Sequence, residues 1–276
     1  DLKSAYPVAV IDFLTEKFCA GVLDGNPDVS TLLIFDPKSE GGVGLIRRVR
    51  RNRYDVVIDL FGNPRSAVLA LLSGARVRVG YRFNWRTLCY NTIVEPRGGT
   101  VHNVEFNLDA LRRLGIPTGS GRPFFPVDPA AERSAEKFFL TSKRNGERVV
   151  ALNPGGGWMS KKWRPEQFAA LGRKLSAVER AKILVLWGPG EEREAENVRD
   201  AIGPEAILAP PTTLKELASL LKRSSTLVTN DSGPMHIAAS LGVPVVAIFG
   251  PTVPRLQGPV FTESAVAVKS DLDCLG

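Results

Sequence analysis

The chain has 276 residues, of which 43% are hydrophobic and 24% charged, and it carries a net charge of +7. It is long enough for two domains with separate cores, and no apolar run approaches the roughly 20 residues that a membrane-spanning helix needs. Most of the positive surplus falls in residues 1–146, which favours an anionic partner such as a nucleic acid, a membrane surface or a phosphorylated substrate.

The first half alternates short apolar runs with amphipathic stretches, a pattern typical of βα units. We expect strands at residues 8–13, 31–35, 55–60 and 76–80, an irregular segment at 81–101, and helices at 15–22, 43–52, 65–72, 101–114 and 130–140. Arginines gather at Arg47, Arg48, Arg50, Arg51 and Arg53, and again at Arg76, Arg78, Arg82 and Arg86. A solvated arginine-rich face would produce the same clusters, so they do not identify the partner.

A polar segment at 142–147 separates this half from a second βα series. Strands are expected at 148–152, 182–187, 206–208, 226–229 and 245–249, and helices at 165–177, 191–201, 214–223 and 234–241. Near-continuous apolar strands indicate parallel sheets covered by helices on both faces. We therefore expect an α/β protein of two Rossmann-like domains, residues 1–146 and 147–276, which face each other across a cleft.

Between two apolar runs near the C-terminus lies a helix-start signal, Asp231 or Ser232 followed by Pro234. A strand, a capped helix and a second strand form a βαβ unit. Its helix N-terminus opens at the edge where parallel sheets bind ligands. The backbone amides there, with Ser232, Gly233 and His236 beside them, suit a phosphate group.

A glycine-rich turn follows the first strand of the second half. Gly155, Gly156 and Gly157 let backbone amides approach a ligand closely, and Lys161 can reach a phosphate as a mobile charge. The turn matches neither GxGxxG nor a Walker loop, and three glycines are also typical of a flexible turn. Glu191 follows another strand; its carboxylate could bind a ribose diol or only stabilise the first turn of a helix.

The cysteines and histidines do not form a metal-binding pattern. Cys19, Cys89 and Cys274 stand in no metal-like or CxxC spacing, and His102 and His236 form no metal-binding pair. We expect a reducing, cytoplasmic setting and no metal. No Ser–His–Asp order or nucleophile elbow is present in the sequence.

Together these segments resemble glycosyltransferase family 9, the lipopolysaccharide heptosyltransferases. The resemblance covers nearly the whole chain and is strongest at residues 153–155, 160–165, 187–191, 230–236 and 249–252. It implies the GT-B architecture and an inverting, metal-independent enzyme without a cofactor. Such an enzyme takes ADP-heptose or a similar nucleotide sugar as co-substrate and extends the inner core of lipopolysaccharide. It implies an anionic lipopolysaccharide precursor as partner, no nucleic acid, and a cytoplasmic location with peripheral contact at the inner membrane.

The resemblance also assigns a donor site to the second half. Lys161 would neutralise the diphosphate leaving group and Asp231 would hold sugar hydroxyls, so these are the expected catalytic residues. Fixed cations and amide dipoles lower the barrier to breaking the bond between sugar and diphosphate. Glu191 would hold the ribose, Thr212 would line the adenine pocket, and His236 would support the phosphate site. The expected donor-binding set is Asn153, Gly155, Gly156, Lys161, Glu191, Thr212, Asp231, Ser232, Gly233 and His236.

Arginines of the first half are the expected acceptor contacts, because the acceptor carries phosphates and carboxylates. Arg65, just past a strand, is the first choice, followed by Arg82 and Arg86. Family members begin with a further strand and a glycine turn carrying an aspartate, the expected general base. That segment would precede Asp1, and further helices would follow Gly276, so we expect a fragment of a longer protein.

Two other functions fit parts of the pattern. A nucleotide-dependent Rossmann oxidoreductase would need GxGxxG after a first strand and an acid about 20 residues further on, and neither half has both. A non-catalytic basic module that binds nucleic acid or anionic lipid fits the charge. It leaves the segments around Gly155 and Asp231 unexplained.

Overall fold

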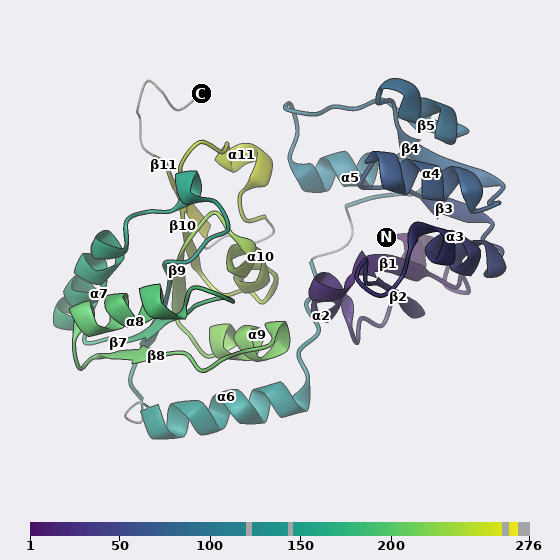
Figure 1. Cartoon of the computed structure of the whole chain (residues 1–276). Helices are drawn as coiled ribbons and strands as arrows, with labels where there is room; N and C mark the ends of the chain where they lie inside the picture. The colour runs from purple at the N-terminus through teal and green to yellow at the C-terminus, as the bar shows by residue number, and fades with distance from the viewer. Residues whose placement is uncertain (120–122, 143–145, 261–264, 270–276) are drawn as a thin grey trace. The chain divides into compact units, whose positions relative to one another are not determined.

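The computed structural model describes residues 1–119, 123–142, 146–260 and the backbone of 265–269. The chain forms two compact units, residues 1–20 with 27–121 and residues 21–26 with 122–276 (Figure 1). The units therefore divide earlier than the polar segment at 142–147. The reason is helix α6 (Pro129–Ser142), whose Ala135 and Phe139 pack in the core of the second unit.

The first unit contains two small parallel sheets. Strand β1 (Asp12–Glu16) pairs with β2 (Thr31–Phe35), and β4 (Val77–Tyr81) lies between β3 (Val56–Ile58) and β5 (Thr92–Val94). Its helical segments are α1 (Leu2–Ala5), η1 (Lys17–Cys19), α3 (Gly42–Arg51), α4 (Pro64–Leu72), η2 (Asn84–Cys89) and α5 (Asn103–Arg112). Helix α2 (Ala20–Leu23) lies almost wholly in the range grouped with the second unit.

Three expectations for the first unit are wrong. The strand expected at 8–13 begins only at Asp12, and in the other two cases strand pairing overrides the local pattern. Residues 15–22 do not form one helix, since Thr15 and Glu16 continue β1 opposite Ile34 and Phe35. The backbone then turns through η1 and α2. The segment 81–101, expected to be irregular, contains β5, which forms a ladder with β4.

The second unit contains one six-stranded parallel sheet with the order β11-β10-β9-β6-β7-β8. Its strands are β6 (Val149–Asn153), β7 (Lys182–Val185), β8 (Ala206–Leu208), β9 (Thr226–Asn230), β10 (Val245–Phe249) and β11 (Ala265–Lys269). Its other helices are η3 (Met159–Lys161), α7 (Pro165–Glu179), α8 (Glu192–Ile202), α9 (Leu214–Lys222), α10 (Gly233–Ser240) and α11 (Pro254–Gln257). When the strands are numbered from β6 within this unit, their order across the sheet is 6-5-4-1-2-3, that of the Rossmann fold. The direction in which the chain adds strands reverses between β6 and β9.

Helices cover both faces of this sheet, which explains its continuous apolar strands. Along β6, Val149 and Ala151 pack with α6, α9 and α10, whereas Val150 and Leu152 pack with α7 and α8. This alternation follows from the two-residue period of a strand. The expected α/β class with parallel sheets is confirmed. In the parts of the chain that the structure describes, no helix is both long and apolar enough to cross a membrane.

Candidate active site

The candidate site lies at the carboxyl ends of β6 and β9, where the strand order reverses. At such a point the connections leave the sheet in opposite directions, and the crevice between them is where open α/β sheets bind ligands. Asn153 ends β6 and Asn230 ends β9, and both side chains are buried. The glycine-rich turn and the start of α10 follow these two strands directly.

Asn230 fastens the loop after β6 to the end of β9. Its Oδ1 accepts a hydrogen bond from the backbone N–H of Trp163 at 2.8 Å. Its Nδ2 donates to the carbonyls of Pro154 at 2.8 Å and Gly155 at 3.1 Å. Because the side chain is completely buried, these bonds replace water on every side. Sequence reasoning quoted Asn230 within a motif but did not name it as a site residue.

Asn153 and Ser232, both in the predicted donor set, are hydrogen-bonded to each other. Asn153 Nδ2 donates to Ser232 Oγ and to Thr229 Oγ1, each at 3.0 Å. Ser232 is the N-cap residue of α10, yet its side chain makes no capping bond. The N–H groups in the first turn of α10, including that of Gly233, are not capped by this hydroxyl. They form the positive end of a helix dipole at the site, an arrangement that binds anions.

Glu191 braces two loops against each other. Its Oε1 accepts from Gly156 N–H at 2.7 Å and its Oε2 from Gly188 N–H at 3.0 Å. The carboxylate also fills the space beside Gly155, where a Cβ would lie 2.1 Å from Oε2. Glu191 therefore shapes the glycine-rich turn from a distance of several tens of residues in sequence. Its predicted contact with a ribose stays a prediction.

Lys161 and Asp231 form an ion pair at the N-terminus of α10. Lys161 Nζ lies 2.7 Å from Asp231 Oδ2, and the side chains are 23% and 7% exposed. Thr252 Oγ1 donates to the same carboxylate oxygen at 2.7 Å. The two expected catalytic residues are thus in contact, and Thr252, which sequence reasoning did not name as a site residue, holds the carboxylate. The signal for Thr252 was its motif at residues 249–252, directly after β10.

The neighbouring Lys162 has a different environment. Its Nζ lies 2.6 Å from Glu194 Oε1 on α8, and the lysine side chain is only 10% exposed. Lys162 therefore anchors the loop to a helix, whereas Lys161 reaches the positive end of α10. An ammonium group beside the N-terminus of a helix can stabilise negative charge that develops on a leaving group.

Two other members of the predicted donor set, Thr212 and His236, lie in the loop after β8 and on α10. Thr212 is half-buried in the loop between β8 and α9, next to Thr213, which caps α9. Among the hydrogen bonds of the described residues, none joins Thr212 to Asn153, Lys161 or Asp231. His236 is exposed on α10, one turn from its start. The roles of both residues stay predictions.

The three predicted acceptor arginines lie in the first unit, each with its own partner. The Arg65 guanidinium lies 5.9 Å from the centre of the Phe35 ring. Arg82 forms an ion pair with Glu95 at 2.7 Å, and its hydrogen bond to that carboxylate raises the pKa of Arg82. Arg86 Nη1 donates to the carbonyl of Gly62 at 2.6 Å. Arg86 therefore supports the loop before α4, and acceptor binding by all three stays a prediction.

Sequence reasoning did not identify Asp59, a buried carboxylate after β3. Its oxygens accept from the backbone N–H groups of Phe61 and Gly62 at 3.1 and 2.9 Å and from the Tyr90 hydroxyl at 2.6 Å. Burial and the hydrogen bond to Asp59 raise the pKa of Tyr90. These bonds fix the loop that leads into α4, whose first turn carries Arg65. Within the described residues, no three His, Cys, Asp or Glu side chains form a group that could hold a metal ion.

Comparison with known proteins gives consistent matches along almost the whole chain. A family model described as "Glycosyltransferase family 9 (heptosyltransferase)" matches residues 43–275. The lipopolysaccharide heptosyltransferase 3 of Escherichia coli is 28% identical over 268 residues, 91% of this chain and 77% of that protein.

Two solved structures share the fold. A family 9 glycosyltransferase from Veillonella parvula has a TM-score of 0.89 at 25% identity and covers 97% of this chain and 80% of that one. The Escherichia coli ADP-heptose lipopolysaccharide heptosyltransferase II has a TM-score of 0.81 at 22% identity and covers 100% and 85%. The fold is therefore that of the GT-B enzymes.

Proposed function

Because the chain belongs to glycosyltransferase family 9, the heptosyltransferases, we propose that it transfers heptose or a related sugar from an ADP-sugar to the inner core of lipopolysaccharide. The relative from Escherichia coli is a lipopolysaccharide heptosyltransferase, which supports this acceptor. The single observation that carries the proposal is the Lys161–Asp231 pair at the N-terminus of α10. It places a cation and a helix dipole where the Rossmann strand order reverses.

The diphosphate of the donor binds at this point in our proposal. Backbone amides near Gly155, Gly156, Ser232 and Gly233 surround it, and Lys161 neutralises it. The adjacent lysines Lys161 and Lys162 differ in their partners. Lys162 is paired with Glu194, so Lys161 is the one that we assign to the diphosphate. Lys161 exchanges its contact with Asp231 for the diphosphate, and Asp231, still held by Thr252, then binds sugar hydroxyls.

The reaction breaks the bond between the anomeric carbon of the sugar and the diphosphate oxygen. An acceptor hydroxyl attacks the opposite face of that carbon, which inverts its configuration, and loses its proton to a base. The electron pair of the broken bond moves to the diphosphate, where Lys161 and the amides of α10 stabilise the new charge. Stabilisation by fixed dipoles and one ammonium is the basis for proposing that no metal is needed.

The acceptor is an anionic, lipid-anchored saccharide in this proposal. Arg65 lies in the first turn of α4 and is exposed, which suits contact with a phosphate or carboxylate. Arg82 and Arg86 are the next candidates. We place the enzyme in the cytoplasm, with peripheral contact at the inner membrane, because its acceptor is anchored there.

Thermal unfolding in the presence of nucleotides tests the donor site. ADP at 100 times its dissociation constant should stabilise the protein by about 2.7 kcal/mol, and NAD should have no effect. Lys161→Ala should weaken ADP binding about 10- to 100-fold, the loss expected for a charge-assisted hydrogen bond. Lys174→Ala, an exposed lysine on α7, is the matched control and should respond like the wild type. Transfer to a lipopolysaccharide precursor is then measured as the release of ADP from ADP-heptose, with and without a chelator.

Other results would reject the proposal. A response to NAD without one to ADP would favour the oxidoreductase. Salt-sensitive binding of duplex DNA, with no response to any nucleotide, would favour the basic module.

A further inference from the structure

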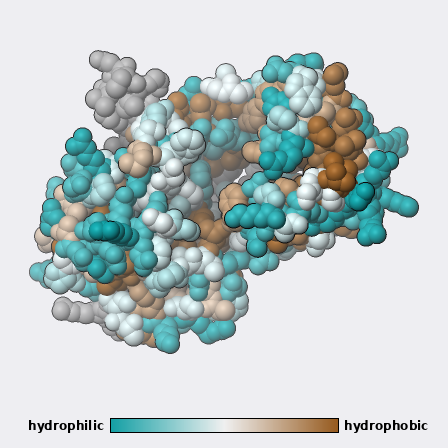
Figure 2. All heavy atoms as spheres, in the orientation of Figure 1, coloured by the Kyte–Doolittle hydropathy of each residue, from teal (hydrophilic) through white to brown (hydrophobic). Residues whose placement is uncertain are grey.

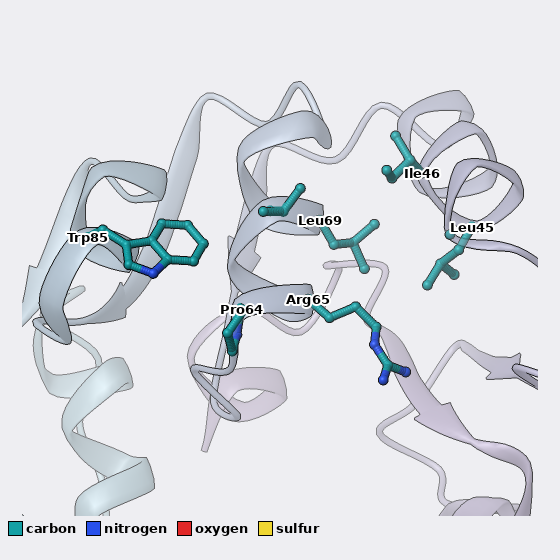
Figure 3. A pocket seen from close by; sticks show the side chains of 8 residues that line it. Leu45, Ile46, Pro64, Arg65, Leu69 and Trp85 are labelled. Carbon is teal, nitrogen blue, oxygen red and sulfur yellow. The ribbon is translucent and has the colours of Figure 1, made fainter.

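The first unit has an apolar pocket that opens on its surface between α3, α4 and η2. The pocket has a volume of about 380 Å³ and is lined by Gly42, Leu45, Ile46, Pro64, Arg65, Val68, Leu69 and Trp85. In Figure 3, Pro64 and Leu69 on α4 lie between Trp85 on one side and Leu45 and Ile46 of α3 on the other. Figure 2 shows a hydrophobic area over α4, with hydrophilic atoms along its edges.

Exposed apolar side chains extend this pocket across the surface. Trp85 and Leu88 are 54% and 82% exposed, and they share a face of η2 because residues three apart are eclipsed in a 3₁₀ helix. Leu72 follows Val68 and Leu69 on the same face of α4 and is also exposed. Large apolar groups at this density on one face are typical of an interaction surface.

Unpaired arginines border the same surface. The segments 42–53, 64–78 and 84–91 contain arginines but no aspartate or glutamate. Arg48 pairs with Glu40, whereas the ion pairs of the described residues include none of Arg47, Arg50, Arg51, Arg53 and Arg76. Arg50 lies one helical turn beyond Ile46 on α3, and a Cβ at Gly74 would lie 4.0 Å from its Cγ. Arg50 therefore lies at the C-terminal end of α4, beside the apolar side chains.

We propose that this face of the first unit, made by α3, α4 and η2, docks on the surface of an anionic phospholipid bilayer. The inference rests on the proposed function, which requires a lipid-anchored acceptor, and it names the docking surface and its partner. Trp85 and Leu88 enter the boundary between headgroups and acyl chains, where indole rings are favoured. Arg47, Arg50 and Arg51 bind the anionic headgroups, and their aliphatic stems cover apolar surface.

Charge complementarity favours a bilayer over another protein chain. A membrane with anionic lipids presents a continuous negative surface. Arg48 and Arg65 pair with Glu40 and Glu16, and Arg47, Arg50 and Arg51, which are in no ion pair of the described residues, can bind that surface. Apolar groups alone would bind neutral and anionic membranes equally. The combination of a shallow apolar face and a basic border is that of proteins that lie on a membrane without spanning it.

Co-flotation of the full chain with lipid vesicles tests the proposal. We expect binding to vesicles of phosphatidylcholine mixed with phosphatidylglycerol, weak binding to phosphatidylcholine alone, and a decrease as salt is raised. Each arginine near an anionic surface contributes about 1 kcal/mol, which changes the partition coefficient about fivefold. The triple variant Arg47→Gln/Arg50→Gln/Arg51→Gln should therefore lower the partition coefficient about 100-fold. Trp85→Ser/Leu88→Ser should lower it roughly tenfold or more.

Matched controls replace exposed residues of the second unit. Arg133→Gln/Lys137→Gln/Lys174→Gln removes three charges, and Leu140→Ser removes a leucine that is 76% exposed on α6. Both should bind vesicles like the wild type. Every variant is first checked for its thermal unfolding without ligand, which reports on folding, and for its shift with ADP, which reports on the second unit. This response also separates the two proposals, since ADP binding can hold while vesicle binding fails.

Three outcomes would overturn the inference. One is equal binding to neutral and anionic vesicles, or to neither. Another is an equal loss of binding in the control variants. The third is a dimer that forms with rising protein concentration and is abolished by Trp85→Ser/Leu88→Ser without any effect on vesicle binding; the face would then bind a second copy of the chain.

Discussion

Replacing Gly155 by alanine should destabilise the second unit, although two more glycines follow it. A Cβ at Gly155 would lie 2.1 Å from Glu191 Oε2 and 2.6 Å from its Cδ. The carboxylate cannot simply move away, because Gly156 N–H and Gly188 N–H both donate to it. The methyl group and these two hydrogen bonds are therefore incompatible.

The expected cost follows from those two bonds. Hydrogen bonds to a charged group contribute about 1.5–3 kcal/mol each, and the site is partly solvated, so the lower value applies. Replacing glycine also lowers the entropy of the unfolded chain, which returns about 0.4–1 kcal/mol. We expect Gly155→Ala to lower the free energy of unfolding by about 2–3 kcal/mol.

Gly157→Ala is the matched control from the same run of glycines. No atom lies within 4 Å of a Cβ built there, and its φ is not in the left-handed region. Its free energy of unfolding should stay within about 1 kcal/mol of the wild type. Urea unfolding of the full chain measures both variants, and ADP affinity should fall only in Gly155→Ala.

A double-mutant cycle isolates the cause. In a Glu191→Ala background the obstacle is gone, so Gly155→Ala should cost less than about 1 kcal/mol. The reasoning is refuted if the cost stays the same in that background, or if Gly155→Ala and Gly157→Ala are equally destabilising.

Two further predictions concern stability. Asn230→Ala removes the side chain that is hydrogen-bonded to Trp163 N–H and to the carbonyls of Pro154 and Gly155. The free energy of unfolding, measured in urea, should fall by about 2–4 kcal/mol. A loss below about 1 kcal/mol would contradict the role of Asn230 as an anchor. The pKa of Tyr90 is raised by burial and by Asp59, and burial raises the pKa of Tyr81 to about 12. Above about pH 10 the unfolded chain therefore binds fewer protons than the folded one, and stability falls by up to about 1.4 kcal/mol per pH unit for each tyrosine. Tyr90→Phe removes one such contribution, so its urea midpoint should fall less steeply than that of the wild type between pH 10 and 11, whereas parallel curves would argue against the raised pKa.

Local signals predicted most of the second unit. The helix after Ser232 begins and ends where Pro234 and Gly242 indicated, and its strands β9 and β10 lie at the apolar runs beside it. Such signals act within a few residues, because a cap, a helical turn and the period of a strand are short-range. The first unit was predicted less well, since β5 exists only through its pairing with β4.

The sequence by itself determined the α/β class and the alternation of strands and helices from β6 to β10, and it predicted the segments that carry the candidate site. Only the tertiary structure decided which of three glycines has no room for a side chain and which of two adjacent lysines contacts Asp231. The reason is the separation of the partners along the chain: Lys161 meets Asp231 over 70 residues and Asn153 meets Ser232 over 79. The folding of the sheet brings these residues together, and no local pattern records which atoms then meet.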